Sequence, residues 1–196
     1  MGNQNGGIYG LTALFPMVSP ESCALLRSKL RAFDLDSRGS PLAAVPIIHM
    51  SRFVIIDRLP YQEYPAHDEH IEGSYLLFCC DFDGASVDQL IRAFLARAPA
   101  ILTEVWGHCA GFPTHPTADR VAAYFEQRQL QTNLFFLDRP DDTVEDILRA
   151  LIIKQAFARF VIAVQRSNPT PEILQRKFLR MWRWLQTRRA PEPGTM

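Results

Sequence analysis

Two charged side chains interrupt an apolar segment at residues 47–53, a position that suits either chemistry or a satisfied structural pair. His49 and Arg52 stand there among isoleucine, methionine and phenylalanine. Burying such groups costs free energy unless they are paired or used. Regular alternation along a strand would place His49, Ser51 and Phe53 on one face and Met50 and Arg52 on the other. Both are therefore candidate catalytic residues, and the alternative is a hydrogen-bonded structural role.

A second candidate lies at the end of another apolar run, where Asp81 and Asp83 precede Gly84. Two neighbouring carboxyl groups can transfer protons when their surroundings separate their pKa values. An Asp-Gly pair is also typical of a turn at a strand end. We take Asp83 as a candidate catalytic residue, with a plain turn as the alternative.

A third candidate is the segment 106–113, Trp-Gly-His-Cys-Ala-Gly-Phe-Pro. A predicted helix ends there at glycine, beside His108 and Cys109. A histidine near a helix C-terminus is favoured in its protonated form. His108 is therefore a candidate catalytic or ligand residue at the mouth of a pocket. A glycine C-cap without any chemistry explains the same pattern.

Metal-ligand residue types cluster only at residues 67–70, His-Asp-Glu-His, and two histidines without a helical frame do not complete a zinc site. We therefore predict no metal. The four cysteines follow no metal or disulfide spacing and are interpreted as small apolar residues in a reducing compartment. Phosphate-binding glycine loops and nucleophile elbows are also missing from the sequence, which argues against nucleotide-dependent enzymes and α/β-hydrolases.

These residues must be positioned by strands and helices, which the hydrophobic pattern predicts. Apolar runs rich in β-branched and aromatic residues predict strands at residues 8–15, 45–57, 74–82 and 133–137. Helical spacing predicts helices at residues 20–33, from 86 to a break at 99, and at 118–128, 143–165 and 171–187. Ser19 with Pro20 marks the first helix start, and Ser86 with Gln89 suggests a capping box.

The order strand-helix-strand, strand-helix-strand is that of the ferredoxin-like fold. We therefore predict an α+β protein, a ferredoxin-like β-α-β-β-α-β antiparallel sheet with additional C-terminal helices. The whole chain, 1–196, is expected to be a single domain. Its parts are a ferredoxin-like core at 8–140, a helical extension at 141–187 and a flexible tail at 188–196. The sheet face without helices needs a cover, either the C-terminal helices or a second subunit.

Charge and composition limit the partners. Lysine plus arginine and aspartate plus glutamate number 21 each, so we predict no nucleic-acid partner. The charges are unevenly distributed along the chain, because the segment from Arg166 onward contains seven basic residues and two acidic ones. The N-terminus has no basic region followed by an apolar run, which predicts a cytoplasmic protein. Residues 147–164 are apolar but carry charges that disfavour a transmembrane segment.

The helix predicted at residues 171–187 has a continuous apolar stripe with basic flanks. Thr170 is its expected N-cap and Pro171 its first residue. We predict that the stripe docks on its own domain. The alternatives are peripheral contact with a membrane surface and docking on a partner.

Residues 44–57, 76–84 and 106–113 resemble segments of a group of poorly characterised bacterial ferredoxin-like proteins, and the resemblance touches residues 8–140. The wider superfamily is the dimeric α+β barrel. It includes haem-binding dye-decolourising peroxidases and chlorite dismutases, together with cofactor-free monooxygenases. The peroxidase signature Gly-x-x-Asp-Gly has a counterpart at residues 80–84, with cysteine in place of the first glycine. The resemblance implies proton transfer by Asp83, an anion or peroxide beside Arg52, and a homodimer.

The sequence thus predicts a small-molecule-binding protein or enzyme with its pocket on the sheet, cofactor-free or a haem-binding oxidoreductase of the peroxidase type. His49 or His108 would be the axial ligand to haem, or otherwise the general base. The alternative is a non-catalytic module for assembly, partner binding or membrane-surface binding that uses the open sheet face or the last helix.

Overall fold

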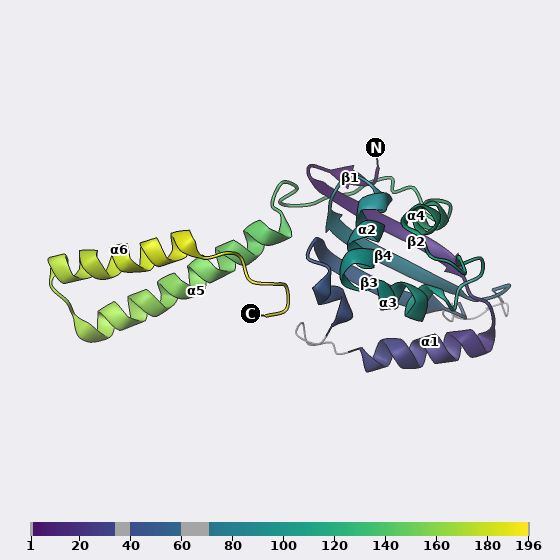
Figure 1. Cartoon of the computed structure of the whole chain (residues 1–196), viewed down its shortest axis with the longest axis horizontal. Coiled ribbons are helices and arrows are strands. Elements are labelled where there is room, and N and C mark those ends of the chain that lie inside the picture. The colour runs from purple at the N-terminus through teal and green to yellow at the C-terminus, as the bar shows by residue number, and fades with distance from the viewer. Residues whose placement is uncertain (1, 34–39, 60–70, 196) are drawn as a thin grey trace, which may run out of the picture.

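The sheet is antiparallel and has its longest strand pairing at the centre. The computed structural model describes residues 2–33, 40–59 and 71–195. Within them, β1 (Gln4–Asn5), β2 (Ile8–Pro16), β4 (Tyr75–Asp83) and β3 (Ile48–Ile56) lie side by side in that order. The described part of the chain is therefore a mixed structure with one four-stranded antiparallel sheet and flanking helices (Figure 1), which agrees with the predicted α+β class.

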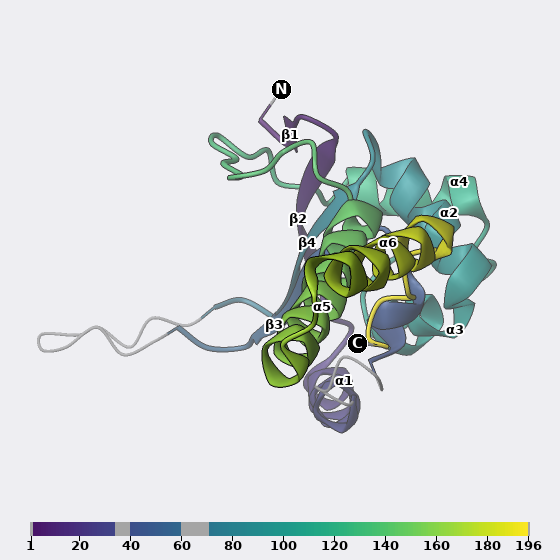
Figure 2. The ribbon, with the colours of Figure 1, turned by 90° about the vertical axis from the view of Figure 1, so that its left-hand side faces the viewer.

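One face of the sheet forms the core. Along β4, Leu76, Phe78, Cys80 and Phe82 are fully buried, and the residues between them are only half-buried. Figure 2 shows α2, α3 and α4 on this buried face. The covering elements are α1 (Pro20–Ala32), α2 (Val87–Arg97), α3 (Pro99–Ile101), the π-helical turn η2 (Leu102–Trp106) and α4 (Ala118–Glu126).

Trp106 lies at the centre of this core. Its ring centroid is 5.0 Å from that of Phe78, 4.8 Å from that of Phe125 and 6.0 Å from that of Phe15. Aromatic pairs in tilted and edge-on geometry contribute beyond the area that they bury. The core thus joins β2, β4, η2 and α4 through a single aromatic cluster.

The predicted helix starts are mostly confirmed. The Ser19 hydroxyl accepts the Ser22 N–H at the start of α1, and Pro99 separates α3 from α2. The predicted capping box of α2 is wrong, because Ser86 makes no side-chain cap bond. Instead, the Gln89 side-chain carbonyl accepts the Ala85 N–H at 2.7 Å.

The strand predicted at residues 133–137 is wrong, because this segment forms no strand. The β2 edge beside it is already occupied by β1. Asn5 Nδ2 donates to the Phe135 carbonyl at 3.1 Å, and the Phe135 ring packs on Gly10, where it leaves no room for a Cβ atom. The Asn5 side chain thus satisfies the Phe135 carbonyl without a ladder partner. Further along β2, Gln129 forms an isolated antiparallel bridge with Ala13.

The last two helices form a hairpin that projects from the rest of the molecule (Figure 1). It comprises α5 (Val144–Ser167) and α6 (Pro171–Thr187). Thr143 and Asp146 form a reciprocal capping box at the start of α5, and Asn168 ends that helix with φ 37°. The apolar stripe of α6, predicted to dock on its own domain, packs on α5, and Leu185 is the one residue of α6 that is buried.

Within the described residues, no helix covers the second face of the sheet (Figure 2). By strand alternation and register, this open face comprises side chains of β2, β4 and β3 that are partly or largely exposed. Met50 is 53% exposed and Val54 is 38% exposed. This face includes the side chains of Leu14, Leu77, Cys79, Asp81, Met50, Arg52 and Val54.

Candidate functional site

The imidazole of His49 and the carboxylate of Asp83 form a close pair. His49 Nε2 lies 2.6 Å from Asp83 Oδ1, and the two side chains are 15% and 19% exposed. A bulge makes this contact, because Ile48 pairs with Phe82 whereas Met50 pairs with Asp81. The extra residue, His49, leaves the regular alternation. The predicted shared face of His49 with Ser51 and Phe53 is therefore wrong, since the imidazole turns to the end of β4.

Asp83 also holds the first turn of α5. Its second oxygen, Oδ2, accepts the Val144 N–H at 3.0 Å. The first N–H groups of a helix have no partner within the helix, and a carboxylate is favoured there by the helix dipole. Asp83 therefore connects the bulged strand β3 to the helical hairpin, which is a structural role for a residue first considered for proton transfer.

Asp81 and Arg52 lie near this pair on the open face. Burial raises the pKa of the Asp81 carboxyl group, while the charges of His49 and Arg52 lower it by less. Two basic and two acidic side chains thus gather at one end of the β3–β4 pair. The structure brings two of the four predicted site residues, His49 and Asp83, into contact, and Arg52 lies opposite Cys79, where its charge acts on Asp81.

His108, the fourth predicted residue, lies at the other end of the sheet. Its carbonyl accepts the Val18 N–H, just beyond β2, whereas Asp83 pairs with Ile8 at the beginning of β2. At about 3.3 Å per residue, the two ends are roughly 30 Å apart. Burial and then the charge of Lys29 lower the pKa of His108, so the protonated form expected at a helix C-terminus is disfavoured.

The segment around His108 completes the end of the sheet. Cys109 forms a bridge with Met17, and the Ala110 N–H donates to the Pro16 carbonyl at 2.7 Å. Burial raises the pKa of the Cys109 thiol to about 12, so it is no nucleophile at neutral pH. The segment around His108 thus joins the end of η2 to the end of β2 through backbone hydrogen bonds.

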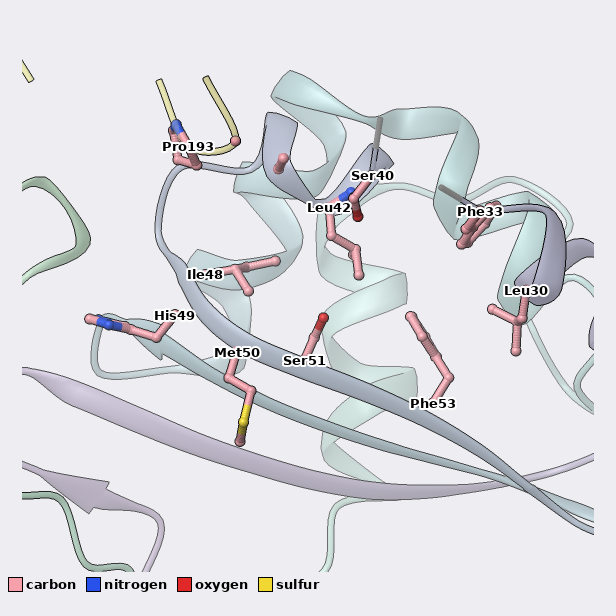
Figure 3. A pocket seen from close by; sticks show the side chains of 12 residues that line it. Leu30, Phe33, Ser40, Leu42, Ile48, His49, Met50, Ser51, Phe53 and Pro193 are labelled. Atoms are coloured by element: carbon pink, nitrogen blue, oxygen red, sulfur yellow. The ribbon is translucent and has the colours of Figure 1, made fainter. Parts of the chain in front are cut away.

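A pocket of about 480 Å³ opens beside the outer edge of β3. Figure 3 shows Leu42, Phe53 and the Ser51 hydroxyl pointing into it, whereas the His49 ring points away. The walls come from the end of α1, the short 3-10 helix η1 (Pro41–Ala44), β3 and the C-terminal segment. The lining residues are Leu30, Phe33, Ser40, Leu42, Ala43, Ile48, His49, Met50, Ser51, Phe53, Pro193 and Gly194.

The positions of His49 and His108 do not fit the predicted role of an axial ligand to haem. An axial ligand needs an imidazole nitrogen aimed into a cavity that accepts the porphyrin. His49 Nε2 is engaged by Asp83 and its ring points away from the pocket, and His108 lines none of the pockets described here. Within the described residues, His, Cys, Asp and Glu form no group suited to a metal ion, and the residues 67–70 lie outside them.

Several pocket residues were not singled out by sequence reasoning. Ser51 was placed on a strand face without a role, Leu42 lies just before the strand predicted at 45–57, and Pro193 lies in the predicted tail. No local pattern identifies them, because Ser51 lies about 10 positions after Leu42 and Pro193 about 150 positions after it. The Ser40-Pro41 pair was the available signal, because it is a helix start between two stronger elements.

The helical hairpin is basic and exposes many apolar side chains. Residues 144–187 contain eight basic and three acidic residues, so this part carries +5 and the rest of the neutral chain −5. The helices also expose large apolar side chains by 36% to 50%. These are Ile147, Leu151, Ile153, Phe157, Ile162, Ile173, Leu174, Phe178, Leu179, Trp182 and Trp184.

Among the helices that the structure describes, none combines the length and apolar character needed to cross a membrane. The chain matches no protein-family model, no curated protein and no solved structure. A function is therefore inferred from the pocket, the His49–Asp83 pair and the two exposed apolar surfaces, on the hairpin and on the open sheet face.

Proposed function

We propose that this protein binds a small, largely apolar molecule in the pocket beside β3. The observation that carries the proposal is the combination of volume and lining. About 480 Å³ is within the range of ligand pockets, and such pockets are mainly apolar with a few placed polar groups. Leu30, Phe33 and Leu42 supply the apolar wall here, and Ser40 and Ser51 supply hydroxyl groups.

The lining also limits the ligand's chemistry. No lysine, arginine or carboxylate lines this pocket among the described residues, and its one ionisable side chain, His49, points away. A buried charge without a partner is costly, so a charged ligand group would be poorly accommodated inside. The pocket therefore suits an uncharged apolar molecule with one hydroxyl, carbonyl or amide group opposite Ser51.

The C-terminal segment is part of the same binding region. Pro193 and Gly194 line the main pocket, and a neighbouring hollow of about 350 Å³ is formed by residues such as Arg97, Glu145 and Pro191. Both hollows include Ala43 and Pro193, so they adjoin at η1. We infer that an elongated ligand would extend from Ser51 toward the C-terminal segment.

We further propose that the fold is a ferredoxin-like variant with a reduced fourth strand. The order β2, α1, β3, β4, α2 and the central place of β2 and β4 support this assignment. The fourth strand would pair with the β2 edge, where Gln129 bridges Ala13 and Leu130 donates to Thr12 at 2.8 Å. The strand β1 takes the rest of that edge.

A catalytic role for His49, Arg52 and Asp83 stays a prediction. A histidine oriented by a carboxylate is the usual arrangement of a general base. The pair lies at the rim of the pocket and would act on a ligand atom outside it, on the open-face side. Binding without catalysis needs fewer assumptions, because Asp83 is already occupied by His49 and Val144.

Binding is tested with N-phenyl-1-naphthylamine, an uncharged fluorescent probe with one N–H group. Ser51→Leu fills the pocket, whereas the matched Val54→Leu adds the same side chain on the open face of β3. We expect saturable binding to the wild type and to Val54→Leu, and at least a tenfold higher Kd for Ser51→Leu, because the added methyl groups occupy ligand volume. Equal Kd values for the three proteins would refute the pocket.

A further inference from the structure

The helical hairpin has an apolar surface that its own chain leaves uncovered. The rings of Phe157, Phe160, Phe178 and Trp182 follow one another across α5 and α6 at centroid distances of 5.9 to 6.4 Å. Phe157 is nevertheless 50% exposed and Trp182 45% exposed. Exposed apolar areas of this extent mark interaction sites in soluble proteins.

The helix α5 is apolar on more than one side. Its half-buried residues, including Ile152 and Phe160, are separate from exposed residues such as Leu151 and Ile162. A helix that is apolar on most sides normally lies in an interior, whereas a membrane-surface helix has one apolar and one polar face. Since α6 covers α5 on one side only, α5 needs a further protein layer.

The open face of the sheet is the second uncovered apolar surface. Leu14 and Leu77 lie at its centre, and Met50 and Val54 lie toward β3. The chain's own hairpin does not cover this face. The first residue of α5, Val144, is bonded to Asp83 at the end of β4, and the helix extends away from the sheet (Figures 1 and 2). Among the described residues, Phe135 covers this face at Gly10, and the part toward β3 lies open. Each chain therefore has a hairpin and a sheet face that its described residues leave largely uncovered.

The hairpin is basic, whereas the open face carries slightly more acidic than basic groups. Residues 144–187 have eight basic and three acidic residues, a net charge of +5, and the rest of the neutral chain carries −5. The open face includes Asp81 and Asp83 with the single arginine Arg52 among its described residues. The segment before α5 adds Asp138, Asp141 and Asp142 with Arg139. Complementary charge favours contact between the hairpin and a sheet face. Two hairpins packed on each other would place like charges together.

We propose that the hairpin of one copy covers the open sheet face of a second copy, and that the contact is reciprocal about a twofold axis. An interface of standard size buries about 800 Å² on each partner. The hairpin exposes eleven large apolar side chains by 36% to 50%, and four of them are aromatic side chains of about 150–250 Å² each, so they can supply a large part of such an area. Reciprocity doubles the contact. This proposal does not depend on the pocket ligand.

The test uses one charge substitution on each surface. Phe178→Glu alters the hairpin, where it also removes ring contacts with Phe160 and Trp182, and Val54→Lys alters the sheet face. The two residues are 39% and 38% exposed and lie outside the sheet core. We expect the wild type to have about twice the chain mass of 22.3 kDa in native mass measurements, and each variant to have the mass of one chain. Circular dichroism spectra of both variants should match the wild type.

Mixing the two variants distinguishes the modes of association. In a reciprocal exchange, the intact hairpin of Val54→Lys meets the intact sheet face of Phe178→Glu, so a tagged variant retains the untagged one. In hairpin-to-hairpin or sheet-to-sheet dimers, mixing restores no intact contact. We also expect maleimide labelling of Cys79, the half-buried cysteine of the open face, to slow at least tenfold from dilute monomer to dimer.

Three results would overturn the proposal. The first is a wild-type mass of 22.3 kDa at all concentrations up to about 100 µM. The second is a dimer disrupted by only one of the two substitutions. The third is a monomer that sediments with vesicles containing anionic lipid and loses this binding in Phe178→Glu, which would assign the hairpin to a membrane surface.

Discussion

Asp83 accepts hydrogen bonds from two directions, since Oδ1 lies 2.6 Å from His49 Nε2 while Oδ2 accepts the Val144 N–H at 3.0 Å. One carboxylate therefore fixes both the bulge in β3 and the first turn of α5. An asparagine has a single acceptor oxygen and turns an N–H₂ group toward the other donor. This relationship makes the substitution Asp83→Asn informative.

We expect Asp83→Asn to lower the free energy of unfolding by about 1 to 2 kcal/mol, which corresponds to about 3 to 6 °C in Tm. Thermal denaturation followed by circular dichroism measures this difference. The control is Asp88→Asn, which removes an exposed ion pair with Arg92 and should cost less than about 0.5 kcal/mol. Equal effects of the two changes would contradict the anchoring role.

His108 should make the protein less stable in mild acid. Its pKa is lowered in the folded state, so its contribution is fully present above the unfolded pKa near 6.5 and is lost as pH falls through the folded value. We expect Tm to fall less between pH 7 and 5 in His108→Gln than in the wild type. Lys29→Met, which removes a neighbouring positive charge, should reduce the acid loss in part.

The capping box at α5 should contribute measurably to hairpin stability. Thr143→Ala removes a hydroxyl that accepts the Asp146 N–H at 3.1 Å and should cost about 1 kcal/mol. Thr170→Ala is the matched control, since Thr170 is the N-cap of α6 without a side-chain cap bond. Hydrogen exchange in the first turn of α5 should rise about fivefold in Thr143→Ala only. Similar rises at both helix starts would show that the Thr143 box is unimportant.

Two cysteines should resist thiol reagents until the protein unfolds. Burial raises the pKa of the Cys80 thiol far above neutrality and that of Cys109 to about 12. The reactive form is the thiolate, so neither residue should react with a maleimide at pH 7.5 within hours. Mass spectrometry of labelled peptides measures this. Rapid native labelling of Cys80 would mean that the β2–β4 pair opens readily.

The parts of the fold with local signals could be predicted from the sequence. Ser19-Pro20 and Thr170-Pro171 identified the starts of α1 and α6, because a cap and a proline act through neighbouring backbone atoms. Residues 133–137 were misassigned, since an apolar run becomes a strand only beside a free sheet edge. Here β1 occupies that edge, and nothing within the run indicates this.

The candidate site could be predicted in its residue types but not in its geometry. A strand with regular alternation was assumed, so the bulge that separates His49 from Ser51 was missed. The pairing of His49 with Asp83 depends on strand register, which a pattern of apolar residues does not determine. The pocket combines η1, β3 and the C-terminal segment, and their proximity is a property of the folded chain.

The position of the Asp83–Val144 bond gives it a mechanical consequence. The helix α5 has 24 residues, a length of about 36 Å, and it is attached to the sheet at its first residue. Since a rigid rod magnifies rotation in proportion to its length, a tilt of about 10° at Val144 moves the far end of α5 by roughly 6 Å. The carboxylate of Asp83 therefore lies at the pivot of a lever, where a small rotation of the first turn of α5 becomes a displacement of several ångströms at the turn between α5 and α6.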